Sequence, residues 1–226
     1  MSVARLEDVA KTYRVGDQDI HALRGVSLEI DDGEFVAIVG PSGSGKSTLM
    51  HLLGCLDTPS SGRMEICGQD LSRASRDRLA RTRNRDIGFV FQSFNLLPRL
   101  DVVANIELPL LYSGLRAADR RRRAEEVARS VGLGERLRNR PTQLSGGQCQ
   151  RVAVARALVN NPRIVFGDEP TGNLDSTTGR LVLDMFRDLH KSGKTIVLVT
   201  HDRDVAAVAP RVIEIRDGKI SRETRS

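Results

Sequence analysis

The sequence has 226 residues, of which 39% are hydrophobic and 28% charged, and this composition excludes a disordered, collagen-like or disulfide-stapled chain. Its net charge of +6 is too small by itself to indicate a nucleic-acid partner, and we expect none. The longest uncharged stretch, Ile87–Pro98, has twelve residues, too few to cross a bilayer, and the N-terminus lacks the apolar core of a secretory signal. We therefore expect a cytoplasmic protein that reaches a membrane only through a partner.

Five short apolar runs, rich in β-branched residues, are predicted as strands. In chain order they are Phe35–Val39, Ile87–Phe91, Arg163–Phe166, Thr195–Val199 and Arg211–Ile215. Helical patterns lie between them, at Lys46–Cys55, Ala117–Val131, Gly146–Val159 and Thr177–Lys191. Strands that alternate with helices favour an α/β fold with a parallel sheet and crossover helices.

The remaining segments predict two additions to this α/β core. Short alternating segments in Val3–Ile30, together with Gly62–Cys67 and Lys219–Arg222 beside glycine turns, indicate a small antiparallel sheet. Residues from about 93 to 157 contain several helical patterns and no convincing strand, so we expect an inserted α-helical subdomain. We expect residues 1–226 to form one domain.

The segment after the first core strand matches the pattern G-x-x-x-x-G-K-[ST], and a helical pattern begins directly after it. Its members are Gly40, Pro41, Ser42, Gly43, Ser44, Gly45, Lys46, Ser47 and Thr48. Gly43 and Gly45 allow the backbone to turn its N–H groups toward phosphate oxygens, and the helix start adds its dipole. Lys46 offers a positive charge to the β- and γ-phosphates, and the Ser47 hydroxyl is a ligand for Mg²⁺. The alternative is a Gly/Ser-rich turn without a ligand.

Two acidic residues follow the third predicted strand. Asp168 comes at the end of this strand, at the edge where α/β sheets bind ligands, and Glu169 follows it. We expect Asp168 to hold Mg²⁺ through its water shell and Glu169 to polarise a water for in-line attack on the γ-phosphate. The alternative, a pair of solvated carboxylates, is disfavoured beside a phosphate loop.

A second predicted phosphate-binding turn is LSGGQ, Leu144–Gln148, about a hundred residues after the first. Ser145 is expected to cap the helix that follows, and Gly146 and Gly147 expose backbone N–H groups. Only the first of the two turns carries a lysine. The second is therefore expected to close over a nucleotide that another copy of the chain holds.

These motifs, in this order, resemble those of the ATP-binding cassette (ABC) ATPases over essentially the whole chain. The resemblance implies a P-loop NTPase (RecA-like) core with an antiparallel β subdomain and an inserted α-helical subdomain. LSGGQ is similar to the family's signature motif, which implies that Ser145, Gly146, Gly147 and Gln148 contact nucleotide.

Four further residues match positions to which this family gives a role. Tyr13 matches the aromatic that stacks on adenine, and Gln92 matches the glutamine that senses Mg²⁺ and the γ-phosphate. Asp175 matches the aspartate of the loop that crosses the dimer interface, and His201 matches the switch histidine that contacts the γ-phosphate. The resemblance thus implies metal contacts by Ser47, Gln92 and Asp168.

Three of these four residues also have a simpler interpretation. Tyr13 could cover a strand edge, Gln92 could be a polar loop residue and His201 could be a surface histidine. The sequence departs from the usual family pattern at Cys149 and Gly167, two small changes that leave the proposed chemistry in place. No chemistry is assigned to His21, His51 and His190.

The resemblance implies a mechanism in which two chains form a head-to-tail homodimer around ATP. The phosphate loop, Glu169 and His201 of one chain would face Ser145, Gly146 and Gly147 of its partner. Hydrolysis by a water activated at Glu169 then removes the contacts of the γ-phosphate and lets the dimer open.

The partner that this ATPase drives is expected to be an integral membrane permease subunit, which would hold the chain on the inner face of the cell membrane. Phe94, Leu96, Leu97 and Leu100 could dock a coupling helix of that subunit, or could pack the helical subdomain. The basic run Arg120–Arg123 is interpreted as a solvated helix face, with a polybasic lipid contact as the alternative.

The stretch Gln92–Leu110 and the segment GNLDS are similar to the ATPases of macrolide-efflux and lipoprotein-releasing transporters of bacteria and a related cell-division pair. In that subgroup the dimer transmits mechanical motion to a four-helix membrane subunit. The alternatives are the ATPase of an importer and that of a non-transporting cell-division or signalling complex. Repair and ribosomal ABC ATPases are disfavoured, because the chain has one cassette, no heptad insertion and no CxxC pair.

Overall fold

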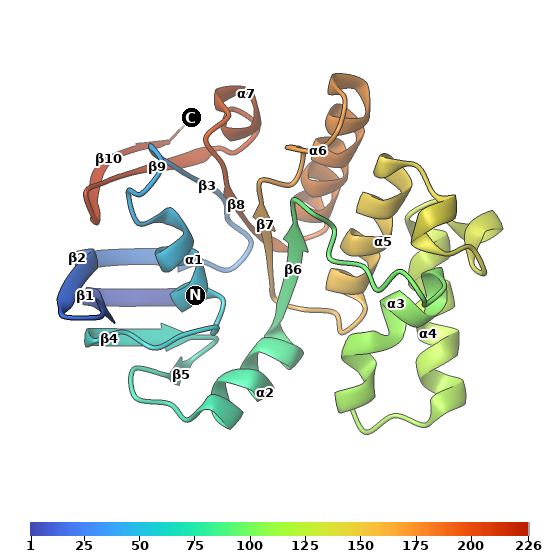
Figure 1. Ribbon diagram of the computed structural model, residues 1–226, viewed down its shortest axis with the longest axis horizontal. Coiled ribbons are helices and arrows are strands. Elements are labelled where there is room, and N and C mark those ends of the chain that lie inside the picture. The colour runs from blue at the N-terminus through green and yellow to red at the C-terminus, as the bar shows by residue number, and fades with distance from the viewer. Residues whose placement is uncertain (226) are drawn as a thin grey trace.

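The computed structural model describes residues 1–225 and contains a six-stranded sheet with the strand order β10-β9-β3-β8-β7-β6 (Figure 1). Its strands are β3 (Phe35–Val39), β6 (Ile87–Phe91), β7 (Ile164–Asp168), β8 (Thr195–Val199), β9 (Arg211–Arg216) and β10 (Lys219–Arg225). The strands from β9 to β6 run parallel, so the predicted α/β core is confirmed. Each of these parallel strands was predicted to within two residues because a largely apolar, β-branched run marks it in the sequence.

A second sheet is antiparallel, with the order β2-β1-β4-β5. It contains β1 (Ser2–Val15), β2 (Gln18–Asp31), β4 (Ser61–Ile66) and β5 (Gln69–Asp70). The expectation of short segments was wrong for β1 and β2, each of which has 14 residues and several register shifts.

The expectation that Lys219–Arg222 belongs to the antiparallel sheet was also wrong, because β10 pairs with β9 at the edge of the larger sheet. The turn between them, Asp217 and Gly218, has positive φ at both residues (49° and 75°). Such a two-residue turn folds a strand directly back on its neighbour, which places β10 beside β9.

Helix α1 (Lys46–Leu53) packs in one buried cluster with residues of both sheets. Helices α5 (Gly146–Leu158), α6 (Ser176–Lys191) and α7 (Arg203–Ala206) cover the other face of the larger sheet in a second cluster. Successive residues of β3 point to the two clusters in turn, since Val36 lies in the first and Ala37 in the second.

The segment between β6 and α5 is helical and lies beside the sheet (Figure 1). Helices α3 (Val102–Glu107) and α4 (Ala117–Ser130) pack with the outward side of α5 in a third buried cluster. Three short 3-10 turns complete the segment, at Leu108–Tyr112, Gly134–Arg136 and Pro141–Gln143. None of the helices in the described part of the chain has both the length and the apolar character needed to cross a bilayer.

Helix α2 (Arg76–Asp86), which leads into β6, was not predicted from the sequence. Its eleven residues bury only Leu79, Thr82 and Asp86, so it has no apolar stripe of the usual width. Its N-terminus is nevertheless capped, because the Ser75 side chain accepts a hydrogen bond from the Arg78 backbone N–H.

Candidate nucleotide-binding site

The predicted phosphate loop joins the end of β3 to the start of α1. Gly40, Gly43 and Gly45 all have positive φ, at 150°, 76° and 107°. A Cβ on Gly45 would lie 2.6 Å from the carbonyl oxygen of Ala22 on β2, so both its φ and its surroundings require glycine. The loop is held in place because the Gly218 N–H donates a 2.9 Å hydrogen bond to the Ser44 carbonyl.

The polar groups inside this loop are suited to an anion. The Lys46 ammonium donates to the carbonyl oxygens of Gly40 and Pro41, at 2.8 and 2.9 Å. The buried hydroxyl of Ser44 has no hydrogen-bond partner within residues 1–225. Lys46 forms no ion pair among residues 1–225, and this cation and the unsatisfied hydroxyl beside a helix N-terminus form a site for phosphate oxygens.

The predicted acidic pair lies at the end of β7. Burial raises the pKa of Asp168, the charge of Glu169 adds to this effect, and His51 and Lys46 oppose it. These interactions bring Asp168 together with the lysine of the phosphate loop. His51 was missed in the sequence, although its spacing of four from Ser47 on α1 puts both on one helix face.

Glu169 is held in an unusual backbone conformation, with φ of 45°. One carboxylate oxygen accepts hydrogen bonds from the backbone N–H of His201 at 2.9 Å and lies 2.6 Å from His201 Nδ1. The other oxygen accepts from the Thr200 hydroxyl at 2.8 Å. Only 18% of the Glu169 side chain is exposed, against 76% of the His201 side chain, so the histidine lies on the solvent side of the carboxylate.

Gln92 follows β6 directly, and the last β6 residue, Phe91, pairs with Asp168 in the sheet. The Gln92 amide donates to Asn173 Oδ1 at 3.3 Å, and the Asn173 amide donates to the Gln92 carbonyl at 3.1 Å. Gln92 is thus linked to the segment that follows Glu169. Spacing alone did not reveal the contact with Asn173, which lies 81 residues away in sequence.

Tyr13 lies on β1 beside Thr48 of the phosphate loop. Its hydroxyl donates to Asp57 Oδ2 at 3.2 Å, and Lys11 pairs with the same carboxylate at 2.7 Å. Burial and the neighbouring Asp57 raise the pKa of Tyr13. The ring is therefore held at the mouth of the phosphate loop, where a nucleotide base could reach it.

The LSGGQ turn forms the start of helix α5. The Ser145 hydroxyl accepts from the Gln148 N–H at 3.3 Å, and the Gln148 side-chain oxygen accepts from the Ser145 N–H at 2.9 Å. This reciprocal capping box was not predicted, although the S-x-x-Q spacing is its sequence signal. A Cβ on Gly147 would lie 2.3 Å from the Thr178 side chain of α6, so this glycine permits the close packing of the two helices.

Asp175 caps α6, because its carboxylate accepts from the N–H groups of Thr177 and Thr178 at 3.1 and 3.0 Å. The nearest neighbours of the LSGGQ glycines belong to this α6 region and to Phe94. Helix α5 lies across β6 and β7 from α1 (Figure 1). One chain therefore brings the phosphate loop, Asp168, Glu169 and His201 to one region, and places LSGGQ and Asp175 in another.

Comparison with known proteins identifies the family of this chain. The family described as ABC transporter matches residues 23–172. An uncharacterized ABC transporter ATP-binding protein of Thermotoga maritima is 56% identical, over 96% of this chain and 93% of that relative. The macrolide export ATP-binding/permease protein MacB of Brucella melitensis is 53% identical over 97% of this chain, which spans only 34% of MacB. A solved dimeric structure of the cassette MJ0796, in a post-hydrolysis state bound to ADP and Pi, matches with a TM-score of 0.89 and 46% identity over 98% of both chains.

These similarities confirm the predicted P-loop NTPase fold and the resemblance to the macrolide-efflux subgroup. The relatives that match over most of their length are ATP-binding proteins, as is the solved cassette. The chain belongs to the ABC transporter family, as an ATP-binding subunit that hydrolyses ATP.

Proposed function

We propose that two copies of this chain associate head to tail and enclose ATP between the phosphate loop of one copy and the LSGGQ turn of the other. The observation that carries this proposal is the separation of the two anion-binding helix starts within one chain. The two turns differ in charge, since LSGGQ has no lysine, whereas the phosphate loop carries the Lys46 ammonium, which is bonded only to the loop's own carbonyls. The dimeric structure of MJ0796, bound to ADP and Pi, supports a dimer of this chain.

In this proposal Tyr13 stacks on the adenine, and residues Gly40–Thr48 bind the phosphates. Ser47, Gln92 and Asp168 would hold Mg²⁺, and their hydroxyl, amide and carboxylate oxygens are the donor types that this ion prefers. Bound there, Mg²⁺ would neutralise charge on the β- and γ-phosphate oxygens. The raised pKa of Asp168 reflects a buried carboxylate that a cation would stabilise.

The hydrolytic step is assigned to Glu169, which accepts the proton of the attacking water. The Thr200 hydroxyl and the His201 backbone N–H each donate a hydrogen bond to its carboxylate and fix its orientation. When ATP binds, the exposed His201 side chain is free to leave Glu169 and donate to the γ-phosphate. Loss of that phosphate removes contacts to Gln92, His201 and the partner's LSGGQ turn, so the dimer opens.

We also propose that a helix of a membrane permease subunit docks on this chain, as the fused permease of MacB suggests. The sequence offered Phe94, Leu96, Leu97 and Leu100 as the docking surface. Phe94 and Leu96 instead pack against the buried clusters, and only Leu97 is strongly exposed, at 47%. This apolar stretch therefore serves mainly to join the helical segment to the sheet.

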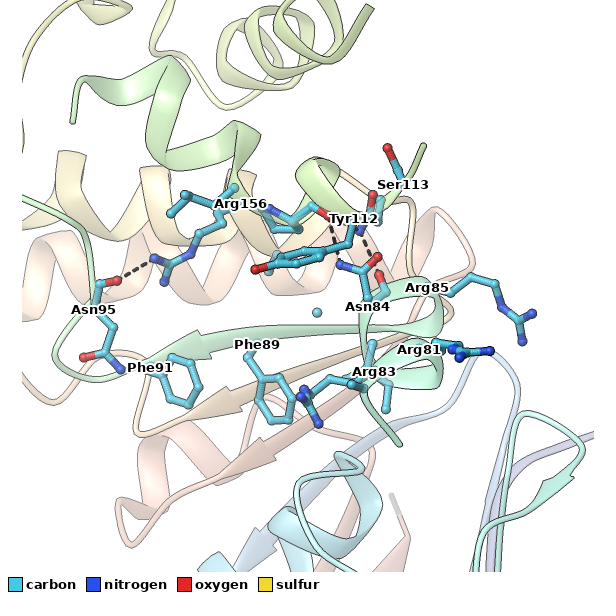
Figure 2. A pocket seen from close by; sticks show the side chains of 17 residues that line it. Arg81, Arg83, Asn84, Arg85, Phe89, Phe91, Asn95, Tyr112, Ser113 and Arg156 are labelled. Atoms are coloured by element: carbon cyan, nitrogen blue, oxygen red, sulfur yellow. Dashed lines mark hydrogen bonds between the residues drawn. The ribbon is translucent and has the colours of Figure 1, made fainter. Parts of the chain in front are cut away.

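A groove of about 1000 Å³ beside it is better suited to a helix (Figure 2). Its walls come from α2 and β6 on one side and from the Leu108–Tyr112 turn and α5 on the other. An α-helix occupies about 400 Å³ per turn, so this groove accommodates about two turns. Such a helix would lie close to Gln92 and could sense the state of the nucleotide.

The full assembly would thus be a homodimer of this chain held by permease subunits on the inner face of the cell membrane. Export or lipoprotein release by mechanical transmission is the favoured use, because MacB is a macrolide export protein. An importer and a non-transporting cell-division or signalling complex would use the same ATPase geometry.

The experiment that tests this function is affinity purification of the tagged Glu169→Gln chain from detergent-solubilised membranes with ATP, followed by mass spectrometry. A four-helix membrane protein with a large extracytoplasmic domain is the expected partner. A polytopic permease with a separate binding protein would indicate an importer. Recovery of soluble proteins or nucleic acid alone would refute the transporter function.

A further inference from the structure

We propose that the groove between α2 and the Leu108–Tyr112 turn selects a membrane-partner helix that carries a carboxylate, and that Arg81 is its principal anchor. This inference rests on the proposed function, because it names the chemistry of the partner helix that the groove receives. It goes beyond that function by predicting a carboxylate on the partner helix and its binding residue, Arg81, on this chain.

The floor of the groove is apolar. Phe89 and Phe91 on β6 stack with ring centroids 5.5 Å apart, and Figure 2 shows both rings along one side of the groove. Tyr112 lies on the opposite wall and is 82% exposed. Aromatic rings this exposed are unusual outside binding surfaces. These rings favour a helix with one apolar face over a fully polar ligand.

The rest of the lining is strongly cationic. It includes Arg81, Arg83, Arg85 and Arg156 and contains no Asp or Glu. Only Arg85 is neutralised, because its guanidinium pairs with Asp86 at 2.8 Å. The groove therefore holds three guanidinium groups without a carboxylate partner among residues 1–225.

These three groups differ in how free they are to bind a partner. Arg156 donates to the carbonyls of Phe94 and Asn95, and Arg83 donates to the carbonyl of Cys55 at 2.6 Å. Both contacts leave the positive charge uncompensated, and burial lowers the pKa of Arg156. Arg81 is exposed and makes no hydrogen bond or ion pair within the described chain, so it is free to form a fork with a carboxylate.

A recessed apolar floor with cationic walls favours a protein helix over the alternatives. Lipid headgroups or nucleic-acid phosphates would meet a projecting basic surface more readily than this recess. Carboxylates on an amphipathic helix, in contrast, reach the walls while its apolar face covers Phe89, Phe91 and Tyr112. Positive charges on the docking helix would be repelled by the arginines of the groove, so the groove also discriminates among membrane proteins.

The test uses the full-length tagged chain with the Glu169→Gln substitution and ATP, in detergent-solubilised membranes. Arg81→Glu is expected to reduce recovery of the membrane partner by about tenfold. Arg76→Glu is the matched control, because Arg76 begins the same helix, is exposed and lies outside the groove lining. Exchange of one Asp or Glu for Arg in a cytoplasmic helix of the recovered partner is expected to restore capture by Arg81→Glu.

The outcomes separate this inference from the function on which it rests. Undiminished capture by Arg81→Glu, or a partner without a carboxylate in its docking helix, would overturn the inference alone. Capture of no membrane protein by any version of the chain would overturn the proposed function and this inference together. Arg81-dependent binding to phosphatidylglycerol vesicles that contain no protein would show that the groove binds a lipid surface, and the inference would be wrong.

Discussion

The Gln150 side chain on α5 donates a 2.6 Å hydrogen bond to the carbonyl of Pro170, the residue that follows Glu169. Gln150 is completely buried, and its own side-chain oxygen has no hydrogen-bond partner in the described chain. The start of the LSGGQ helix is thus linked to the backbone beside the proposed base. A shift of α5 on contact with a second chain would therefore be transmitted directly to Glu169.

Where α5 packs against α6, Gly147 has less space for a side chain than Gly146. We expect Gly147→Ala to destabilise the chain by about 1 kcal/mol, because its methyl group would overlap the Thr178 side chain. Gly146→Ala places its methyl at an ordinary 3.4 Å from Leu174 and should leave stability equal or slightly higher. Urea unfolding of both variants tests this, and equal stabilities would contradict the packing argument.

The assignment of Glu169 predicts a separation of binding from turnover. Glu169→Gln keeps the shape of the side chain but removes its basicity, so ATP binding should persist while hydrolysis falls by about 100-fold or more. Nucleotide titration and phosphate release measure the two quantities. Normal turnover would rule out Glu169 as the base, and Glu135→Gln, at an exposed position outside the site, serves as the control.

Thr200 is predicted to position the carboxylate of Glu169. Thr200→Val retains the buried shape but removes the hydroxyl that donates to Glu169, so kcat should fall by about tenfold with little change in KM. Thr200→Ser retains the donor and should recover most of the loss. A Ser variant as slow as the Val variant would indicate that packing, and not the hydrogen bond, is what matters.

Lys46→Ala should weaken ATP binding itself by about 10- to 100-fold, since a charged hydrogen bond to phosphate is lost. Equilibrium binding of a fluorescent ATP analogue provides the measurement. Lys191→Ala removes an exposed lysine that pairs with Asp188 and should leave affinity unchanged. Unchanged affinity in Lys46→Ala would count against the phosphate-loop assignment.

The Asp57 carboxylate, which accepts a hydrogen bond from Tyr13, should make the stability of the fold depend on pH. Burial opposes ionisation of Asp57, but the Lys11 ammonium, the Thr58 N–H and the Tyr13 hydroxyl together outweigh it and lower the pKa of Asp57 below the usual 3.8. Because the folded pKa is depressed, this carboxylate stabilises the fold above pH 3.8, and the contribution disappears as pH falls through the folded value.

Asp57→Asn should therefore destabilise the chain near pH 7 by less than about 1 kcal/mol, since the pair is partly exposed. The difference from the unsubstituted chain should shrink as the pH is lowered below 3.8. Denaturant unfolding at several pH values measures it. A difference that is constant with pH would exclude the ion pair with Lys11 as its origin.

The sequence predicted the strands whose residues are largely apolar. The strands at Ile87–Phe91 and Thr195–Val199 were placed correctly because parallel strands are apolar on both faces. Helix α2 was missed because its residues are mostly polar, and the position of β10 was missed because pairing depends on the turn at Asp217.

In the candidate site, too, features set by consecutive residues could be predicted, whereas contacts between distant segments could not. The phosphate loop, Ser145 and Asp168 could be proposed from the sequence because each belongs to a motif of consecutive residues. The Gln92–Asn173 link and the groove around Arg81 join segments that are distant in sequence, and nothing in either segment alone indicates the other. Such contacts depend on how the sheet and the helical segment pack.

Leu96 packs against both the second and the third hydrophobic clusters, four residues after Gln92. Helices α3 and α4 share a buried cluster with the outer side of α5, whose inner side packs on the sheet. Contact of bound nucleotide with Gln92 is then expected to rotate the segment of α3 and α4 about Leu96, without bending the sheet. Because β6 forms one wall of the groove and the Leu108–Tyr112 turn of the helical segment forms the other, each rotation of that segment would change the width of the groove and would move a helix docked in it.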